Sequence, residues 1–229
     1  MKTNNKSNKS ETSNIVKICF DESKISDILG LCKNRKNEFV EKSNNLFQEN
    51  SKPTGIYYLR EGKVKIFKKG NNGVEQIVRF VTPGDLFGMR SVILDENHKT
   101  SVAAIEDSIV CKIPTKEFMC LLEEKPELSF CIIDCLNKLL IEAERRNISI
   151  VQKSEKERLA ETLLIVSKKF GSDTIKLLKK DLVNYSNIGR ENLTMYLRKF
   201  NEKRLIAFNS ERIKLIDING LEVLAKMSA

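Results

Sequence analysis

Residues 181–206 read DLVNYSNIGRENLTMYLRKFNEKRLI, and this stretch decides the organisation of the chain. The pattern predicts a short helix, a tight turn around Gly189 and a longer helix, with Ile188 inserted into the core between them. In the longer helix, apolar side chains recur at the spacing of one helical face: Leu193, Tyr196, Leu197 and Phe200. This is the layout of a helix-turn-helix, whose second helix places its N-terminal side chains in the DNA major groove. An ordinary helical hairpin with a solvated charged face is the alternative.

The opposite side of the second helix carries the candidate DNA contacts. Arg190 and Glu191 begin the helix, where an arginine can bind guanine O6 and N7 in a bidentate fork and a carboxylate can accept from cytosine N4. Gly189 and Asn192 flank them, where a backbone N–H and a side-chain amide could hold phosphates. Farther along the same side lie Thr194, Met195 and Arg198. We expect base contacts from the three charged residues of this side.

The segment after the helix-turn-helix predicts a wing. Residues 205–209 and 212–216 flank a polar turn and have the composition of a short hairpin. A wing usually lies on phosphates or in the adjacent minor groove, so we assign Arg212 and Lys214 to DNA contact. A last short helix is expected over residues 220–227.

From about Arg35 the period of the apolar residues changes to two, which is typical of β-strands. The alternation continues without a break through residues 58–68, and polar turn clusters follow it. Residues 86–94 and 100–113 complete a series of short strands. Short strands separated by such turns predict an antiparallel β-roll or barrel.

A helix without internal Gly or Pro is expected over residues 126–152 and carries two apolar stripes. One stripe contains Leu128, Ile132, Cys135 and Leu139, and the other contains Ile133, Leu136, Leu140, Ala143, Asn147 and Ile150. A surface helix needs one stripe, so two stripes indicate burial on two sides, one against the roll and one against a second copy. We assign the first stripe to a dimer interface. The alternative is a helix sandwiched within one chain.

The chain therefore has an α+β fold. A short helix with Thr115 as its N-cap should end the roll, and Ser154 with Glu157 forms the S-x-x-E pattern of a capping box after a hinge. Gly171 should end the helix that Ser154 begins. The expected divisions are a disordered tail at 1–14, an effector or sensor roll at 15–125 with a helical start up to residue 31, a dimerisation helix at 126–152, and a winged helix-turn-helix at 153–229.

Composition sets limits on partners and location. The 229 residues carry 40 Lys and Arg against 31 Asp and Glu, which gives a net charge of +9. A basic protein suits a polyanionic partner, and the alternative is a solvated Lys-rich surface without such a partner. No apolar run approaches the roughly 18 residues of a membrane span, and the N-terminus has no signal-peptide core, so we expect a cytoplasmic protein with no membrane contact. The 6 Cys are scattered and should be free thiols that pack as small apolar side chains.

An ordered set of motifs runs through the chain. The roll contains Tyr57-Tyr58-Leu59, Glu61-Gly62-Lys63-Val64, Pro83-Gly84-Asp85 and Phe87-Gly88, and the C-terminal part contains Ile188-Gly189-Arg190-Glu191-Asn192-Leu193 and Lys203-Arg204-Leu205-Ile206. Together they resemble the cyclic-AMP receptor protein/Fnr (Crp/Fnr) family of bacterial transcription regulators over about residues 39–224. The resemblance implies an effector roll, a long dimerisation helix and a winged helix that binds a palindromic operator as a homodimer. It also implies Arg190 and Glu191 as base contacts and RNA polymerase as a partner.

The resemblance places the effector-pocket candidates at Gly88, Met89, Arg90, Ser91, Lys99 and Thr100. In the cyclic-AMP binders of the family, a Glu that accepts from the ribose stands where this chain has Met89, which has no such acceptor. Their phosphate-binding Arg corresponds to Lys99, which can hold a phosphate only as a point charge. We therefore do not expect cyclic AMP as the effector, and no other cofactor is predicted. Met195 replaces a third base-contacting Arg, so the half-site should differ.

Other sensor chemistries find little support in the residues. An iron–sulfur sensor needs about four clustered Cys near the N-terminus, and only Cys19 and Cys32 lie there. Cys131 and Cys135 could be a redox pair or metal ligands, but filling a helix interface is favoured. A haem sensor needs an axial ligand, and the single His98 is expected to be solvated in its polar loop, which leaves Cys or Met ligation open. The roll therefore senses a ligand, a redox change or nothing.

Two readings from other protein classes remain. A cupin-like metalloenzyme would need several His and acidic side chains converging in the roll, and the single His argues against it. No catalytic or metal site is predicted. A cyclic-nucleotide-binding regulatory subunit that acts on another protein would have no use for Arg190 and Glu191 on a recognition helix. A DNA-binding transcription regulator is the function that the sequence favours.

Overall fold

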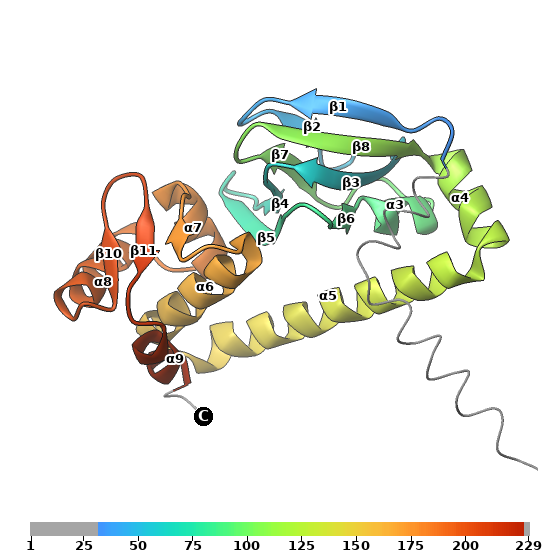
Figure 1. Ribbon diagram of the computed structural model, residues 1–229. Helices are drawn as coiled ribbons and strands as arrows, with labels where there is room; N and C mark the ends of the chain where they lie inside the picture. The colour runs from blue at the N-terminus through green and yellow to red at the C-terminus, as the bar shows by residue number, and fades with distance from the viewer. Residues whose placement is uncertain (1–31, 227–229) are drawn as a thin grey trace, which may run out of the picture.

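The computed structural model describes residues 32–226 and shows a β-rich N-terminal part and a helical C-terminal part joined by one long helix (Figure 1). The tail expected at residues 1–14, the helical region expected at residues 15–31 and Met227 of the last helix lie outside the described residues. No helix in the described part combines the length and the apolar character needed to cross a bilayer.

The N-terminal part is the predicted antiparallel β-roll, made of two four-stranded sheets. Its strands span Lys36–Val40 (β1), Asn45–Phe47 (β2), Gly55–Glu61 (β3), Val64–Lys69 (β4), Glu75–Val81 (β5), Leu86–Phe87 (β6), Ser101–Ala104 (β7) and Ser108–Pro114 (β8). One sheet has the order β1-β8-β3-β6 and the other β2-β7-β4-β5. Apolar side chains of both sheets meet between them, and burying this surface stabilises the roll: Tyr57, Leu59, Val64, Ile66, Val81, Phe87, Val102, Ala104 and Val110.

The strand predicted without a break over residues 58–68 is in fact two strands in different sheets. Gly62 separates β3 from β4 and has a φ of 85°, a left-handed conformation that a side chain disfavours. A Cβ at this position would lie 2.3 Å from the Ser108 Oγ atom. Alternating apolar residues continue on both sides of Gly62, so the periodicity alone hides the crossing between sheets.

The strand predicted over residues 86–94 is wrong beyond its first two residues. After β6, Gly88 is the N-cap of a short helix, α3 (Met89–Ile93), which turns Met89 and Val92 into the core. The predicted cap at Thr115 is also wrong: Pro114 occupies the N-cap of α4 (Thr115–Glu124), and no side chain caps that helix.

The long helix α5 (Pro126–Gln152) runs beneath the roll toward the C-terminal part (Figure 1). A second buried cluster of the roll lies between the sheets and α5 and includes Ile56, Met89 and Phe118. Leu128 and Ile132 are 0% and 3% exposed and belong to this cluster, and the half-buried Cys135 and Leu139 pack against it. The assignment of this stripe to a dimer interface is therefore wrong. The roll covers it because α4 turns the chain directly back under the sheets, so this stripe is the inner face of α5.

The C-terminal part is the predicted winged helix-turn-helix. Its elements are α6 (Glu155–Phe170), β9 (Thr174–Ile175), α7 (Lys179–Ser186), α8 (Arg190–Glu202), β10 (Ile206–Phe208), β11 (Ile213–Leu215) and α9 (Ile218–Lys226). The wing is a three-stranded sheet of order β10-β11-β9, and its third strand was not predicted. The Ser154–Glu157 capping box is present, and Gly171 ends α6 in a left-handed conformation, both as predicted.

The two parts share one continuous core. Leu159, Leu182 and Phe200 of the C-terminal part belong to the same buried cluster as Phe80 of the roll. The Phe80 ring lies 4.8 Å from the Tyr185 ring, centre to centre. The C-terminal part of the chain is therefore packed on the roll and does not stand apart from it.

Candidate nucleic-acid interface

The turn between α7 and α8 has the geometry that the sequence predicts. Asn187 ends α7 in a left-handed conformation and donates its backbone N–H to the Val183 carbonyl over 3.1 Å. Ile188 is 1% exposed and fills the angle between the helices. Gly189 then starts α8 from an extended conformation, and its carbonyl accepts from the Leu193 N–H over 2.8 Å.

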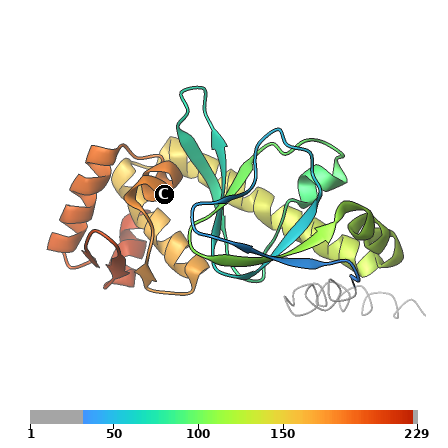
Figure 2. The same ribbon diagram turned by 90° about the horizontal axis from the view of Figure 1, so that it is seen from above.

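One face of α8 is buried and the other is uncovered. Leu193, Leu197 and Phe200 are fully buried, as the apolar spacing predicts. Arg190, Glu191, Met195 and Arg198 are exposed, and Thr194 is half-buried. These five residues line a shallow depression of about 540 Å³ together with Lys199 and Glu202. In Figures 1 and 2, α8 lies at the outer end of the C-terminal part, away from the roll. A DNA duplex can approach this face without meeting any other segment of residues 32–226.

The start of α8 is open to an anion. No side chain caps the helix, so backbone N–H groups of its first turn have no side-chain partner and can donate to a phosphate. The Thr194 hydroxyl donates to the Arg190 carbonyl over 3.0 Å and stays within the helix. Thr194 can therefore offer a base its methyl group, which suits a thymine methyl.

Asn192 lies beside the predicted phosphate site, but its amide already has a partner. The amide nitrogen donates to a carboxylate oxygen of Glu155 at the start of α6, over 2.7 Å. Next to this pair, Arg158 donates to the Asn187 carbonyl over 3.1 Å and to the Lys153 carbonyl over 2.9 Å. The first turn of α6 thus braces both the turn and the recognition helix, a role that the sequence analysis missed. The capping-box prediction used Ser154 and Glu157 and assigned no role to Glu155 or Arg158.

The wing presents its predicted basic residues to solvent. The Asn209 side chain accepts from the backbone N–H groups of Glu211 and Arg212 at 2.9 Å and so closes the tip. Arg212 and Lys214 are both exposed. Further exposed basic side chains surround α7 and α8 and were not among the predicted contacts: Lys176, Lys179, Lys180, Lys199, Lys203 and Arg204. These basic residues lie close together along the sequence, and this clustering could have indicated a surface that binds DNA.

The effector-pocket candidates of the roll are divided between the core and the surface. Met89 is 2% exposed and packs in the core beneath the roll, and Ser91 is also buried. Gly88 is half-buried with a φ of 83°, while Arg90 is exposed. Lys99 points to solvent, where its Nζ atom pairs with Glu96 at 3.0 Å. Thr100 beside it is half-buried.

His98 is not solvated, contrary to the prediction. It is 2% exposed, its ring stacks on Phe47 at 3.8 Å, and its Nδ1 atom lies 3.1 Å from the Ser91 hydroxyl oxygen. Burial lowers the pKa of this imidazole below its usual value. The Phe47 ring also lies 5.5 Å from the Tyr57 ring and 6.4 Å from the Phe87 ring, centre to centre, so aromatic side chains fill this end of the roll.

The cysteines of the described residues are free thiols, as expected. Cys32, Cys111 and Cys131 are buried, whereas Cys120 is exposed and does not act as core filler. Burial, with a contribution from nearby Glu117, raises the pKa of the Cys32 thiol to about 11, which makes it a poor nucleophile. Within residues 32–226, no three His, Cys, Asp or Glu side chains are grouped to hold a metal ion.

The outer face of α5 is an apolar surface that no described part of the chain covers. Its large exposed side chains are Phe130, Ile133, Leu140, Ile141, Ile148 and Val151, which we call the outer stripe. At 100° per residue, these six side chains lie on one side of the helix. The face available to a partner is therefore the one opposite the four residues assigned from the sequence.

Comparisons with known proteins agree with this architecture. Residues 37–125 match the family model "Cyclic nucleotide-binding domain". The chain is 29% identical over 187 residues to the nitrogen fixation regulation protein FixK of Bradyrhizobium diazoefficiens, covering 79% of this chain and 78% of that protein. It is 26% identical over 189 residues to the anaerobic regulatory protein of Haemophilus influenzae, covering 80% of this chain and 73% of that protein.

Solved structures show the same fold. FixK2 from Bradyrhizobium japonicum superimposes with a TM-score of 0.78 at 21% identity, covering 85% of this chain and 99% of that chain. A CRP/FNR family transcriptional regulator from Thermus thermophilus superimposes with a TM-score of 0.72 at 21% identity, covering 85% of this chain and 100% of that chain. The likeness therefore extends through the roll, the long helix and the C-terminal part.

Proposed function

We propose that this chain, which belongs to the Crp/Fnr family of transcription regulators, binds a palindromic DNA operator as a homodimer and regulates transcription there. One observation carries the proposal: Arg190, Glu191 and Arg198 stand on the uncovered face of α8. This helix has the position of a recognition helix in a helix-turn-helix, and the wing lies beside it. Arg190 and Glu191 contact bases, while the α8 backbone, Arg212 and Lys214 contact phosphates.

The dimer forms through the outer stripe of α5. Isolated apolar residues on a surface are ordinary, but a continuous apolar stripe along one helix marks an interaction site. A second copy offers the same stripe, and two such helices related by a two-fold axis cover each other. In a parallel pairing of the two helices, both copies of α8 lie at the same end of the dimer, as two half-sites about one helical turn apart require.

Cyclic AMP is not the effector in this proposal. Met89 lies in the core and provides no acceptor for a ribose hydroxyl, and the Lys99 ammonium is paired outside the roll. The stacked rings of Phe47 and His98 occupy the roll interior beside them. The roll senses another ligand, a redox change or nothing, and RNA polymerase is the partner through which bound protein acts. The chain works in the cytoplasm and has no catalytic role of its own.

The test is selection of bound sites from random DNA with the purified protein. The expected result is a palindrome whose halves are enriched together, with enrichment lost for Arg190→Ala. Lys116→Gln on α4 also removes one positive charge, but from an exposed position outside the DNA face, and should select the same palindrome. Recovery of no common sequence by the wild-type protein would refute the proposal.

A further inference from the structure

The first helix of the helix-turn-helix is held at its start by the roll. The Lys65 ammonium of β4 lies 2.7 Å from an Asp181 carboxylate oxygen in the first turn of α7 and 2.8 Å from a Glu75 oxygen of β5. The Lys65 and Asp181 side chains are 12% and 3% exposed, so water screens this pair little. Asp181 also stands at the positive end of the α7 dipole.

The other end of α7 is held as well. Its last-turn carbonyls have no partner within the helix. The Gln76 amide of β5 donates to the Asn184 carbonyl over 2.7 Å. Arg146 of α5 donates to the Tyr185 carbonyl and to the Val78 carbonyl of β5, each over 2.6 Å, and its guanidinium lies 4.4 Å from the centre of the Tyr185 ring. One side chain therefore ties the long helix, the roll and the helix-turn-helix together.

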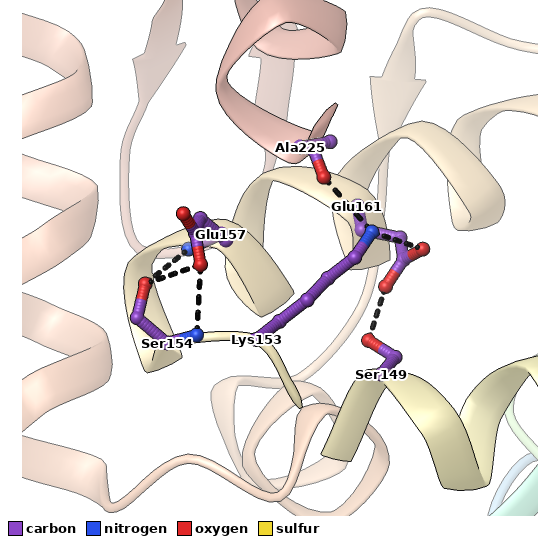
Figure 3. A network of polar contacts seen from close by, with 6 residues as sticks. All are labelled: Ser149, Lys153, Ser154, Glu157, Glu161 and Ala225. Atoms are coloured by element: carbon purple, nitrogen blue, oxygen red, sulfur yellow. Dashed lines mark hydrogen bonds and ion pairs between the residues drawn. The ribbon is translucent and has the colours of Figure 1, made fainter. Parts of the chain in front are cut away.

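A second set of contacts locks the hinge between α5 and α6, as Figure 3 shows. Glu161 accepts from the Ser149 hydroxyl on α5 and from the Lys153 ammonium, the latter over 2.8 Å. The same ammonium donates to the Ala225 carbonyl of α9 over 2.8 Å. The hinge residue thus binds both helices of the C-terminal part that flank it, and rotation about the hinge breaks these contacts.

In this arrangement the DNA-facing side of α8 is uncovered, so the docked orientation can engage DNA. We infer that Arg146, Lys65 and Glu161 are positioning residues that fix the angle of the recognition helix and thereby set the half-site spacing that the dimer selects. The inference rests on the proposed function. None of the three side chains lies on the face of α8 that meets DNA.

The half-site spacing that the dimer selects follows from the fixed angle of its two recognition helices. Each base pair inserted between half-sites moves one half-site by roughly 3.4 Å and rotates it by about 35°. Two recognition helices held at a fixed angle match one spacing. If the contacts at α7 and the hinge are loosened, the shared apolar core still holds the C-terminal part on the roll but no longer fixes its angle, so this part can tilt to follow its half-site and several spacings bind with similar affinity.

The test measures Kd of the full-length protein for the selected palindrome and for versions with two base pairs added or removed. We expect the wild type to bind the altered spacings about 100-fold more weakly, and Arg146→Gln to reduce this penalty to less than about 10-fold. Arg146→Lys keeps the charge but lacks the planar fork whose two nitrogens donate to the Val78 and Tyr185 carbonyls, so it should resemble Arg146→Gln. Base preference within a half-site should stay unchanged, as should all values for the Lys116→Gln control.

Glu161→Gln provides an independent variant, because it removes the charge that pairs with Lys153 and leaves the shape of the side chain. If either Arg146→Gln or Glu161→Gln fails to fold, as judged by its thermal melt, the other decides the question. Folded variants that keep the full spacing penalty would overturn the inference while leaving the proposed function intact. A wild-type protein without sequence-specific binding would instead defeat the proposed function.

Discussion

Glu155 accepts a hydrogen bond from the side-chain amide of Asn192 over 2.7 Å, and this contact joins the first turn of α6 to the first turn of the recognition helix. Both residues are at or near the surface, so the pair itself contributes little to stability. The pair matters because it lies at the start of α8, where a phosphate would bind. The Asn192 amide is the group expected to meet a phosphate, and the Glu155 carboxylate competes with that phosphate for the same donor.

This competition predicts that Glu155→Gln tightens DNA binding. Removing a negative charge close to the duplex should raise the affinity for random DNA by about 3- to 10-fold at low salt, with a smaller gain at high salt. Asn192→Ala should weaken binding because its phosphate contact is lost. Fluorescence anisotropy at several salt concentrations measures both effects. If Glu155→Gln weakens binding as much as Asn192→Ala, the carboxylate positions the amide and does not compete with phosphate.

The second prediction separates base contacts from phosphate contacts. Arg190→Ala should cost about 1–3 kcal/mol on the selected site and relax the preference at one base pair in each half-site. Lys214→Ala in the wing should weaken all sequences alike and reduce the salt slope by about one unit. Titrations of specific and random duplexes compare the two. An equal loss on both duplexes for Arg190→Ala would show that this residue does not contact bases.

The third prediction concerns the two faces of α5. Leu140→Asp places a charge in the outer stripe and should yield a folded monomer, because the Leu140 side chain is 56% exposed and belongs to none of the core clusters within residues 32–226. Ile132→Asp introduces a charge of the same size on the inner face, where the side chain is 3% exposed, and should cost roughly 3–5 kcal/mol of folding stability. Light scattering at micromolar concentration and urea unfolding measure the two effects. A Leu140→Asp protein that remains dimeric would exclude the outer stripe as the interface.

The fourth prediction is a pH dependence that comes from His98. Burial lowers the folded-state pKa of His98 below the unfolded value of about 6.5, so the folded protein favours the neutral imidazole. The stability that the neutral, buried His98 contributes is fully present above a pH of about 6.5. As the pH falls below it, the unfolded chain binds a proton that the folded chain excludes, and stability decreases by up to about 1.4 kcal/mol per pH unit. Urea unfolding between pH 7.5 and pH 5 should show a smaller decrease for His98→Gln. Equal slopes for the two proteins would remove His98 as the cause.

Periodicity was sufficient to predict the recognition helix and the roll. The buried face of α8 follows directly from the spacing of Leu193, Leu197 and Phe200, since a helix exposes every third or fourth residue to the same surroundings. The same tool failed at Gly62, where alternation continues on both sides of the crossing between sheets. The prediction of a strand over residues 86–94 was also wrong, although Met89 and Val92 are three residues apart, a spacing that puts them on one face of a helix and on opposite faces of a strand.

The features of the candidate site that could not be predicted from the sequence depend on contacts between residues far apart in the chain. The helical spacing of the apolar residues depends on the local sequence alone, so it was sufficient to place Arg190 and its neighbours on the exposed side of α8. The two stripes of α5 were visible in the sequence, but deciding which one faces the roll requires the position of α4. His98 lies in a polar loop whose composition suggests solvent, and only the folded roll brings Phe47 over its ring. The same holds for Glu155, which lies far along the chain from Asn192.

The outer stripe of α5 also bears on the fate of newly made chains. A copy that leaves the ribosome alone shows six large apolar side chains along one helix, the kind of surface that chaperones bind and that promotes aggregation. Pairing hides it. We therefore expect the protein's cellular half-life to lengthen as its own abundance rises, since proteases meet fewer unpaired copies when partners are plentiful.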